Sequence, residues 1–186
     1  QSQIMGFAKD REVVGSLQDG TYLKRPDILA YPKDLIERVR QGVVAFHCSV
    51  EKWFNPMQLS PNMNQQEIES LRMGFDLIID IDSKYKLEHA AVAADVLCSQ
   101  LKDFGVKATI KFSGSRGFHV GVSGESFPES IDFKKINRFY PQIPQAVSEF
   151  LIGKIKDRLL EELIAREGGV ASLVKTADSI SELSAF

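Results

Sequence analysis

Hydrophobic positions recur with two different periods along this chain, which predicts a mixed α/β (α+β) fold. The central stretch is an apolar run that ends in Asp-Ile-Asp. Side chains of a strand alternate between its two faces, so Leu77, Ile79 and Ile81 are expected on one face. Asp80 and Asp82 are then expected together on the other face. We expect the rest of the chain to be organised around this strand.

Residues 1–63 predict a small αβ module at the N-terminal end. Residues 11–17 and 21–25 flank an Asp-Gly turn, a sequence that is typical of a β-hairpin. Pro26 is expected to end the second strand of this hairpin, because proline cannot donate a ladder hydrogen bond.

The same module predicts one helix and one further strand. A proline in the first turn, an apolar stripe and Gly42 after the last turn predict a helix over residues 32–41. The β-branched and apolar residues 43–50 predict a buried strand that ends before Trp53. His47 lies on this strand, where a histidine is more often hydrogen-bonded core than a ligand, so we leave it outside the predicted site.

The sheet that carries the motifs is expected within residues 64–141. Asn64 and Glu67 match the capping box of a helix that precedes the central strand. Apolar positions at helical spacing predict a helix over residues 86–104, and residues 106–112 predict the next strand. The order strand, helix, strand indicates a βαβ or split-βαβ unit, in which the two strands are parallel and adjacent or once removed. Their carboxyl ends would then lie near each other.

The turn after the second of these strands is suited to anions. Residues 113–119 read Ser-Gly-Ser-Arg-Gly-Phe-His and lead into a returning strand. The glycines allow backbone N–H groups to converge, Ser113 adds a hydroxyl donor, and Arg116 offers a forked cation that matches phosphate. His119 can donate a hydrogen bond to a phosphate oxygen. Taken alone, the same sequence is an ordinary hairpin loop.

Two carboxylates on one face of a strand require a compensating cation, because like charges this close disfavour ionisation. Hard divalent ions such as Mg²⁺ or Mn²⁺ prefer such oxygen ligands. The alternative is that Asp80 and Asp82 only cap the exposed end of a buried strand. Beside an anion-binding turn the metal interpretation is favoured. The two elements together describe a site for a nucleoside triphosphate with its metal ion.

The remainder of the chain carries weaker signals. Residues 127–144 hold aromatic and basic side chains that suit either contacts with a nucleic-acid strand or the packing of a surface loop. These side chains are Phe127, Phe133, Lys134, Lys135, Arg138, Phe139 and Tyr140. Residues 142–186 are expected to form a helical segment and a tail, with an amphipathic helix over residues 145–166 and no motif from residue 170 onward.

Composition fits one globular protein with a sizeable core. The chain has 186 residues, of which 44% are hydrophobic and 26% charged, and its formal net charge is −2. Any nucleic-acid binding must therefore come from a local basic strip. Two cysteines are too few for a disulfide framework or a Cys-rich zinc site, so we expect no zinc and a reducing, cytoplasmic location. No apolar run is long enough to span a membrane, so no membrane partner is expected.

At the motifs, the chain resembles the archaeo-eukaryotic primase superfamily, specifically the archaeal small catalytic primase subunit and its primase-polymerase relatives. Residues 77–82 resemble the first catalytic motif, a hydrophobic strand that ends in Asp-x-Asp. Residues 112–119 resemble the second, Ser-Gly-x-Arg-Gly-x-His. The N-terminal hairpin is also similar, so the resemblance spans residues 8–150. It implies a primase-polymerase fold, with an RRM-like catalytic unit and an N-terminal αβ module in a single catalytic domain over residues 1–186.

The resemblance also implies roles for the motif residues. Asp80 and Asp82 would bind the catalytic Mg²⁺ or Mn²⁺ ions, and Ser113, Arg116 and His119 would hold the triphosphate of an incoming NTP or dNTP. The expected activity is that of a DNA primase, a nucleotidyltransferase that makes primers on a single-stranded DNA template. A large primase subunit or other replication proteins would be its partners.

Two features of the superfamily have no counterpart here. A third metal-binding acid on a later strand cannot be placed, although Asp132 and Asp178 are candidates, and a Cys/His zinc knuckle is missing. Because the third acid is missing, we expect the chain to be the N-terminal part of a longer protein that supplies it, and the start at Gln1 rather than Met is consistent with an excised or processed piece. This chain alone would then be inactive in primer synthesis and would leave one edge of its sheet unpaired.

Two other functions remain open at the level of sequence. Haloacid-dehalogenase-like phosphatases also carry Asp-x-Asp at a strand end, in which case Asp80 would be a covalent nucleophile and Asp82 a general acid. Ser83 stands beside Asp82 where that family has a different pattern. The other alternative is a degenerate primase-like module that binds nucleic acid without catalysis.

Overall fold

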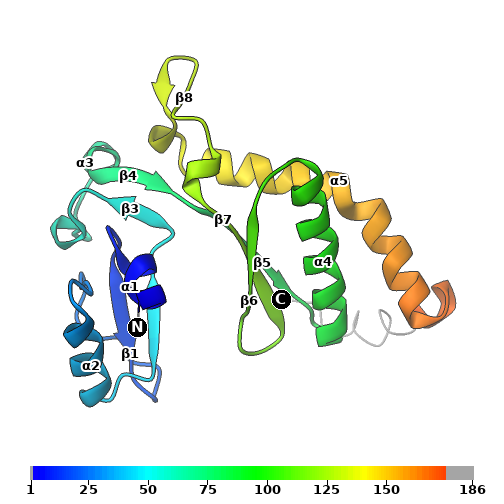
Figure 1. The fold of residues 1–186 in the computed structure, drawn as a ribbon, viewed down its shortest axis with the longest axis horizontal. Coiled ribbons are helices and arrows are strands. Elements are labelled where there is room, and N and C mark those ends of the chain that lie inside the picture. The colour runs from blue at the N-terminus through cyan, green and yellow to red at the C-terminus, as the bar shows by residue number, and fades with distance from the viewer. Residues whose placement is uncertain (1, 175–186) are drawn as a thin grey trace. The chain divides into compact units, whose positions relative to one another are not determined.

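The computed structural model describes residues 2–174 and confirms a mixed α/β fold built from small sheets (Figure 1). The chain divides into two compact units. The first unit comprises Gln1–Asp76 and Pro128–Tyr140, and the second comprises Leu77–Phe127 and Pro141–Phe186. The single catalytic domain that the sequence predicts over all residues stays a prediction. Among the residues described, no helix is both long and apolar enough to cross a membrane.

The first unit opens with two short helices and a two-stranded sheet. Its elements are α1 (Ser2–Ala8), β1 (Val13–Ser16), α2 (Pro32–Arg40) and β2 (Ala45–Cys48). β1 pairs with β2 in antiparallel register. The small core of this region is formed by Ala8, Val13, Leu29 and Leu35, with Met5 and Phe46 packed against it.

The predicted hairpin is present only in part. Gly20 has a φ of 84°, as the Asp-Gly turn requires, and Leu17 N donates to Thr21 O at 2.8 Å. The second strand, however, is reduced to an isolated antiparallel bridge between Ser16 and Tyr22. β1 instead forms its backbone hydrogen bonds with β2. Helix α2 is confirmed, and Gly42 follows it with a φ of 92°.

The predicted buried strand over residues 43–50 is wrong in two respects. β2 pairs only with β1, and its side chains are exposed or half-buried. β2 ends at Cys48, and a separate strand, β3 (Glu51–Trp53), begins after two intervening residues. Trp53 therefore lies within a strand. β3 pairs antiparallel with β4 (Arg72–Phe75), which follows η1 (Pro56–Gln58) and α3 (Gln65–Leu71). The capping box of Asn64 and Glu67 at the start of α3 is confirmed.

The second unit is built on a three-stranded sheet. Its elements are β5 (Leu77–Asp82), α4 (Leu87–Asp103), β6 (Ala108–Phe112), β7 (Gly117–Val122), η2 (Gly124–Ser126) and α5 (Gln142–Glu167). The strand order is β5-β7-β6, and β7 is antiparallel to both neighbours. β5 and β6 are therefore parallel and once removed, which confirms the split-βαβ alternative.

The core of the second unit lies between this sheet and the two long helices. Figure 1 shows α4 and α5 beside the sheet. Buried residues of β5, β7, α4 and α5 form one cluster, namely Leu77, Val92, Ala94, Val96, Leu97, Leu101, Val120, Val122, Leu151 and Ile155. Since one face of the sheet is covered in this way, the other face is free to carry polar side chains.

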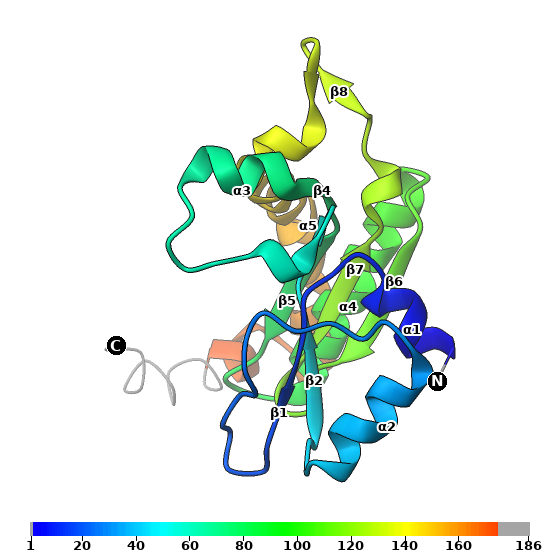
Figure 2. The ribbon, with the colours of Figure 1, turned by 90° about the vertical axis from the view of Figure 1, so that its left-hand side faces the viewer.

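A small hairpin is inserted between η2 and α5 and belongs to the first unit. It consists of β8 (Ser130–Ile131) and β9 (Lys134–Lys135), followed by η3 (Ile136–Phe139). Its tip extends away from η3, as Figure 2 shows.

Candidate active site

β5 presents its two carboxylates on the face of the sheet that the helices leave uncovered. Leu77 is buried, and Ile79 and Ile81 are half-buried and pack against the core. Asp80 and Asp82 are both exposed. The predicted alternation is therefore confirmed, because the acids share one face and the apolar residues share the other.

The β6–β7 hairpin brings the second motif beside the first. In the register of β5 and β7, Asp80 lies opposite His119 and Asp82 lies opposite Gly117. Ser83 N donates to Arg116 O at 3.1 Å, which continues the contact one residue beyond the strand. His119 Nε2 is 3.4 Å from Asp80 Oδ1. The two motifs, separated in sequence by a whole helix, thus meet at one end of the sheet.

The turn itself has the shape that the glycines suggest. Ser113 N donates to Gly117 O at 2.9 Å and closes the turn, and Gly114 has a φ of 98°. Arg116 is exposed at the tip, and no side chain within residues 2–174 pairs with its guanidinium. This forked cation is therefore available to an anion.

The register adds one residue that sequence reasoning missed. Lys111 on β6 lies opposite His119 on β7, and His119 lies opposite Asp80. Directly opposed residues share a face of the sheet, so Lys111, His119 and Asp80 form one row across it. The strand order was needed to find Lys111, although alternation along β6 could have placed it on the polar face.

Gly117 permits the close approach of the two motifs. A Cβ atom at this position would overlap the carbonyl oxygen of Ile81 and lie 2.5 Å from Asp82 Oδ1. The backbone of β7 can therefore lie against the end of β5 only if residue 117 has no side chain. This glycine fixes the spacing between the carboxylates and the turn.

Asp80 and Asp82 are the residues of this site that could hold a divalent metal ion. The exposed oxygens of Asp80 and Asp82 are hard ligands on one face, which fits Mg²⁺ or Mn²⁺ with further positions filled by water and phosphate. Within the described part of the chain, no group of three or more His, Cys, Asp or Glu side chains could hold a metal. Of the two candidate third acids, Asp132 lies on the β8–β9 hairpin of the first unit and Asp178 lies outside the described residues.

An ion-pair cluster behind the site ties α5 to α4. Ser83 Oγ accepts hydrogen bonds from the backbone of Tyr85 and Lys86 just before α4. Glu167, the last residue of α5, accepts from Lys86 Nζ at 2.7 Å and lies 2.8 Å from His89 Nε2. The hydrogen bonds from Lys86 and then from His89 hold the pKa of the Glu167 carboxyl below its ordinary value of 4.5. The cluster thus holds the end of α5 against the start of α4, next to the end of β5.

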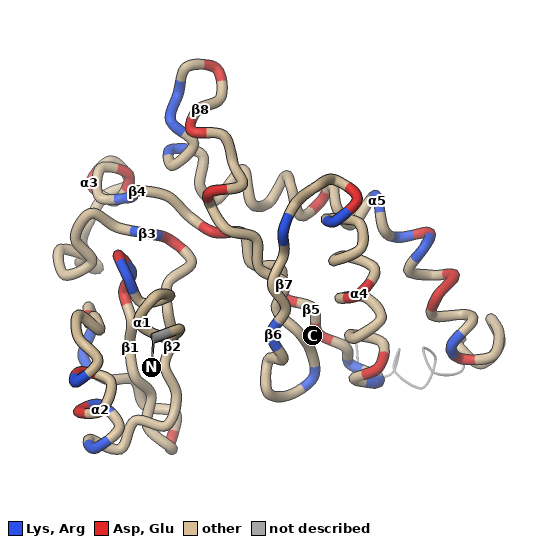
Figure 3. Tube along the Cα trace, viewed as in Figure 1, with Lys and Arg blue, Asp and Glu red and all other residues tan. Residues whose placement is uncertain are grey.

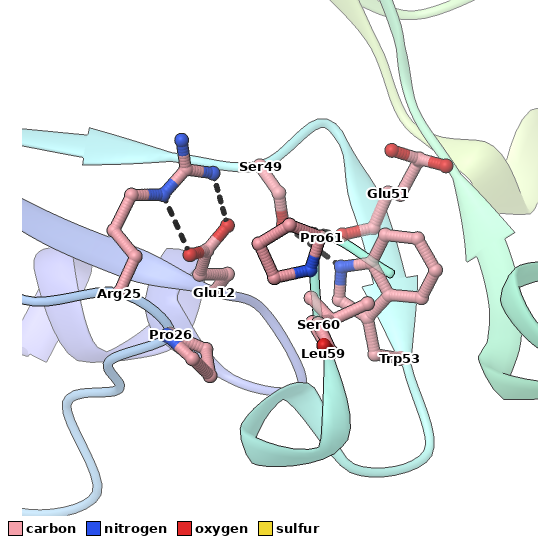
Figure 4. A pocket seen from close by; sticks show the side chains of 9 residues that line it. All are labelled: Glu12, Arg25, Pro26, Ser49, Glu51, Trp53, Leu59, Ser60 and Pro61. Carbon is pink, nitrogen blue, oxygen red and sulfur yellow. Dashed lines mark hydrogen bonds and ion pairs between the residues drawn. The ribbon is translucent and has the colours of Figure 1, made fainter. Parts of the chain in front are cut away.

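The first unit contains a separate cavity of about 440 Å³ (Figure 4). Arg25 at its rim donates through Nε and Nη2 to the carboxylate of Glu12, at 2.8 and 2.6 Å. These contacts raise the pKa of Arg25 above its ordinary value. Trp53 Nε1 donates to Ser49 Oγ at 3.3 Å on the opposite wall. Because the exposed guanidinium is already paired, this cavity lacks a free cation for an anionic ligand.

Comparisons with known proteins identify the family and the fold. The model of the LigD primase-polymerase domain family matches residues 26–161. An uncharacterised protein of Methanocaldococcus jannaschii is 27% identical over 149 residues, which cover 79% of this chain and 31% of that protein. The polymerase domain of Mycobacterium tuberculosis ligase D, solved in complex with DNA, has a similar fold, with a TM-score of 0.52 and 14% identity. That match covers 82% of this chain and 58% of the other.

The chain thus spans about a third of the curated relative and a little over half of the solved one. The matched segment includes both motifs and the whole three-stranded sheet. The superfamily expected from the motifs is supported, whereas the narrower resemblance to the archaeal primase small subunit stays a prediction. This chain belongs to the LigD primase-polymerase domain family.

Proposed function

We propose that this chain carries the catalytic face of a metal-dependent nucleotidyltransferase that extends or primes a nucleic-acid strand from NTP or dNTP substrates. The observation that supports this most strongly is the row of Asp80, His119 and Lys111 across one exposed sheet face. Two carboxylates and the basic groups of a tight turn lie on adjacent strands. This combination suits a metal ion and a triphosphate bound side by side.

In the proposed reaction, the 3′-hydroxyl of the growing strand loses its proton to solvent, and its oxygen forms a bond to the α-phosphorus of the nucleotide. The bond from that phosphorus to the β-bridging oxygen breaks, and pyrophosphate leaves. A bound divalent ion supplies positive charge to the reacting phosphate. Asp80 and Asp82 would hold that ion and would not attack the substrate themselves.

The basic groups of the site bind the triphosphate. Arg116 donates its forked N–H groups to phosphate oxygens, and Ser113 and the turn backbone add neutral donors. His119 donates from the middle of the sheet, and Lys111 adds a charge on the next strand. These groups stabilise the negative charge that develops on the leaving pyrophosphate. A single-stranded DNA template, and a large primase subunit or other replication proteins as partners, belong to the same proposal.

Family membership favours nucleotidyl transfer over the aspartyl-phosphatase alternative. In the phosphatase reaction Asp80 would become covalently modified, so trapping with beryllofluoride separates the two mechanisms. Beryllofluoride bound to Asp80, together with no detectable binding of NTPs, would support the phosphatase mechanism.

The proposal is tested by titrating Mn²⁺ and a labelled nucleotide into the wild type and the Asp80→Asn/Asp82→Asn double variant. We expect metal-dependent nucleotide binding to be lost in the double variant. The matched control is Asp95→Asn/Asp157→Asn, which removes the same charge from exposed positions on α4 and α5. Equal nucleotide binding by both double variants would contradict the proposed function. Retained DNA affinity without nucleotide binding in the wild type would indicate the degenerate binding module.

A further inference from the structure

The β8–β9 hairpin carries an unusual tip. The two residues that connect its strands, Asp132 and Phe133, have φ values of 48° and 62°. Both therefore adopt the left-handed conformation, which is uncommon for residues other than glycine and costs conformational energy. The Phe133 side chain is fully exposed, at 106% of its reference area. The hairpin thus holds a large aromatic ring in solvent at the expense of backbone strain.

The segment after the hairpin is firmly attached to the first unit. Asn137 Nδ2 donates to Arg72 O at 2.6 Å, and Arg72 Nη1 donates back to Asn137 O at 3.4 Å. The Arg72 side chain is buried and paired with Glu51 at 2.7 Å. Its guanidinium also lies 4.9 Å from the ring centre of Tyr140. The exposed tip therefore extends from a base that is anchored to the β3–β4 sheet.

Exposed charges of both signs surround the tip, where Glu129 and Asp132 lie beside three basic side chains. Lys134, Lys135 and Arg138 are exposed, and none of them forms an ion pair with a carboxylate in the described part of the chain. Figure 3 shows both basic and acidic positions on the segment around β8. Three unpaired cations beside a solvent-exposed ring favour an anionic partner that also offers flat apolar surfaces.

We propose that the β8–β9 hairpin is a binding element for single-stranded nucleic acid, in which Phe133 stacks on an unpaired base and Lys134, Lys135 and Arg138 contact phosphates. Base stacking needs only one accessible ring face and is tolerant of sequence. A protein partner would instead require a continuous apolar patch around the ring, and the neighbours of Phe133 are charged. The inference rests on the proposed function, because it assigns a contact to the strand that the enzyme would copy or extend.

The test is the affinity of the chain for a fluorescently labelled oligothymidylate, measured by anisotropy. Phe133→Ala is expected to weaken binding roughly 5- to 140-fold, the effect of losing one stacked base. Phe133→Trp should retain the affinity, and its fluorescence should be quenched on binding. Phe54→Ala, which truncates another exposed ring of the first unit, is the control and should bind as the wild type does.

The salt dependence of the affinity tests the phosphate contacts. Removing one lysine that neutralises a phosphate should reduce the slope of log affinity against log salt by about 0.7, so Lys134→Ala/Lys135→Ala should reduce it by roughly 1.4. A blunt duplex offers no open base face along its length, so its affinity should not depend on Phe133.

Unchanged oligothymidylate binding in Phe133→Ala would overturn the inference. Concentration-dependent self-association that Phe133→Ala abolishes, with DNA binding unchanged, would overturn it in favour of a protein interface. Failure of the proposed function would look different. In that case Asp80→Asn/Asp82→Asn would leave Mn²⁺-dependent nucleotide binding intact, while DNA binding would still depend on Phe133.

Discussion

Replacing Gly117 by alanine should damage the site without altering any charged group. In the structure an added Cβ would overlap the Ile81 carbonyl oxygen and lie 2.5 Å from Asp82 Oδ1. The first of these atoms belongs to the backbone of β5, so it cannot rotate away. The strands must separate at this end, which would break the pairing of residue 117 with Asp82 and move the carboxylate.

Inserting a methyl group into a packed site typically costs about 1–3 kcal/mol. Because the obstructing atom here is backbone, we expect the upper end, about 3 kcal/mol, for Gly117→Ala. For a chain of this size, such a loss corresponds to a fall in Tm of roughly 6–12 °C. Metal-dependent nucleotide binding should weaken as well, since the misplaced carboxylate lies in the proposed metal site.

The assay is urea denaturation followed by circular dichroism, together with Mn²⁺-dependent nucleotide binding. Gly74→Ala is the matched control, because its Cβ would meet no atom within 4 Å and its backbone needs no glycine. A Gly117→Ala variant as stable and as active as Gly74→Ala would refute the argument that close strand approach fixes the site.

Three further predictions concern the second unit. Leu97 is 2% exposed in the core, so Leu97→Ala should lower the free energy of unfolding by about 2–5 kcal/mol in urea denaturation. Leu160→Ala, at an exposed position, should lower it far less. Similar losses for the two variants would mean that Leu97 does not lie in the core. Glu167→Gln should lower the free energy of unfolding at neutral pH, because the carboxyl has a lowered pKa in the folded state. The difference in this free energy between variant and wild type should vanish as the pH falls through that pKa, below 4.5. A difference that persists in acid would exclude the ion-pair cluster as its cause. Arg116→Ala should weaken nucleotide affinity by about 1.5–3 kcal/mol, more than Ser115→Ala, because it removes a charged donor; the reverse order in a binding titration would contradict the assumed turn geometry.

Local patterns predicted the second unit well. Alternation along β5 correctly separated Asp80 and Asp82 from the apolar face, and helical spacing of apolar residues located α4. These features depend on neighbours within a few residues, which the sequence displays directly. The split-βαβ order also follows from the sequence of elements, but the position of β7 between β5 and β6 selects one of two alternatives.

Long-range contacts explain what the sequence could not predict in the first unit. The residues predicted as one strand over 43–50 are interrupted near Ser49, where the buried Arg11 side chain donates to Ser49 O and Val50 O at 2.9 and 2.7 Å. Arg11 also pairs with Asp76 at 2.5 Å, at the break between β4 and β5. An arginine that is remote in sequence and satisfies carbonyl groups in this way leaves no periodic signal. Lys111 differs, because alternation along β6 could have placed it on the polar face, but only the strand register brings it into the candidate site.

The once-removed arrangement of β5 and β6 has a kinetic consequence. β6 and β7 are joined by a short turn, so their hairpin can form early, within about 1–10 μs. β5 must then find β7 across the whole of α4, and such non-local pairing is slow because the entropy of loop closure is lost before the strands pair. We therefore expect the carboxylate strand to join last. Asp80 and Asp82 would lie near the phosphate-binding turn only after the folding barrier has been crossed, so a collapsed intermediate would bind neither metal nor nucleotide.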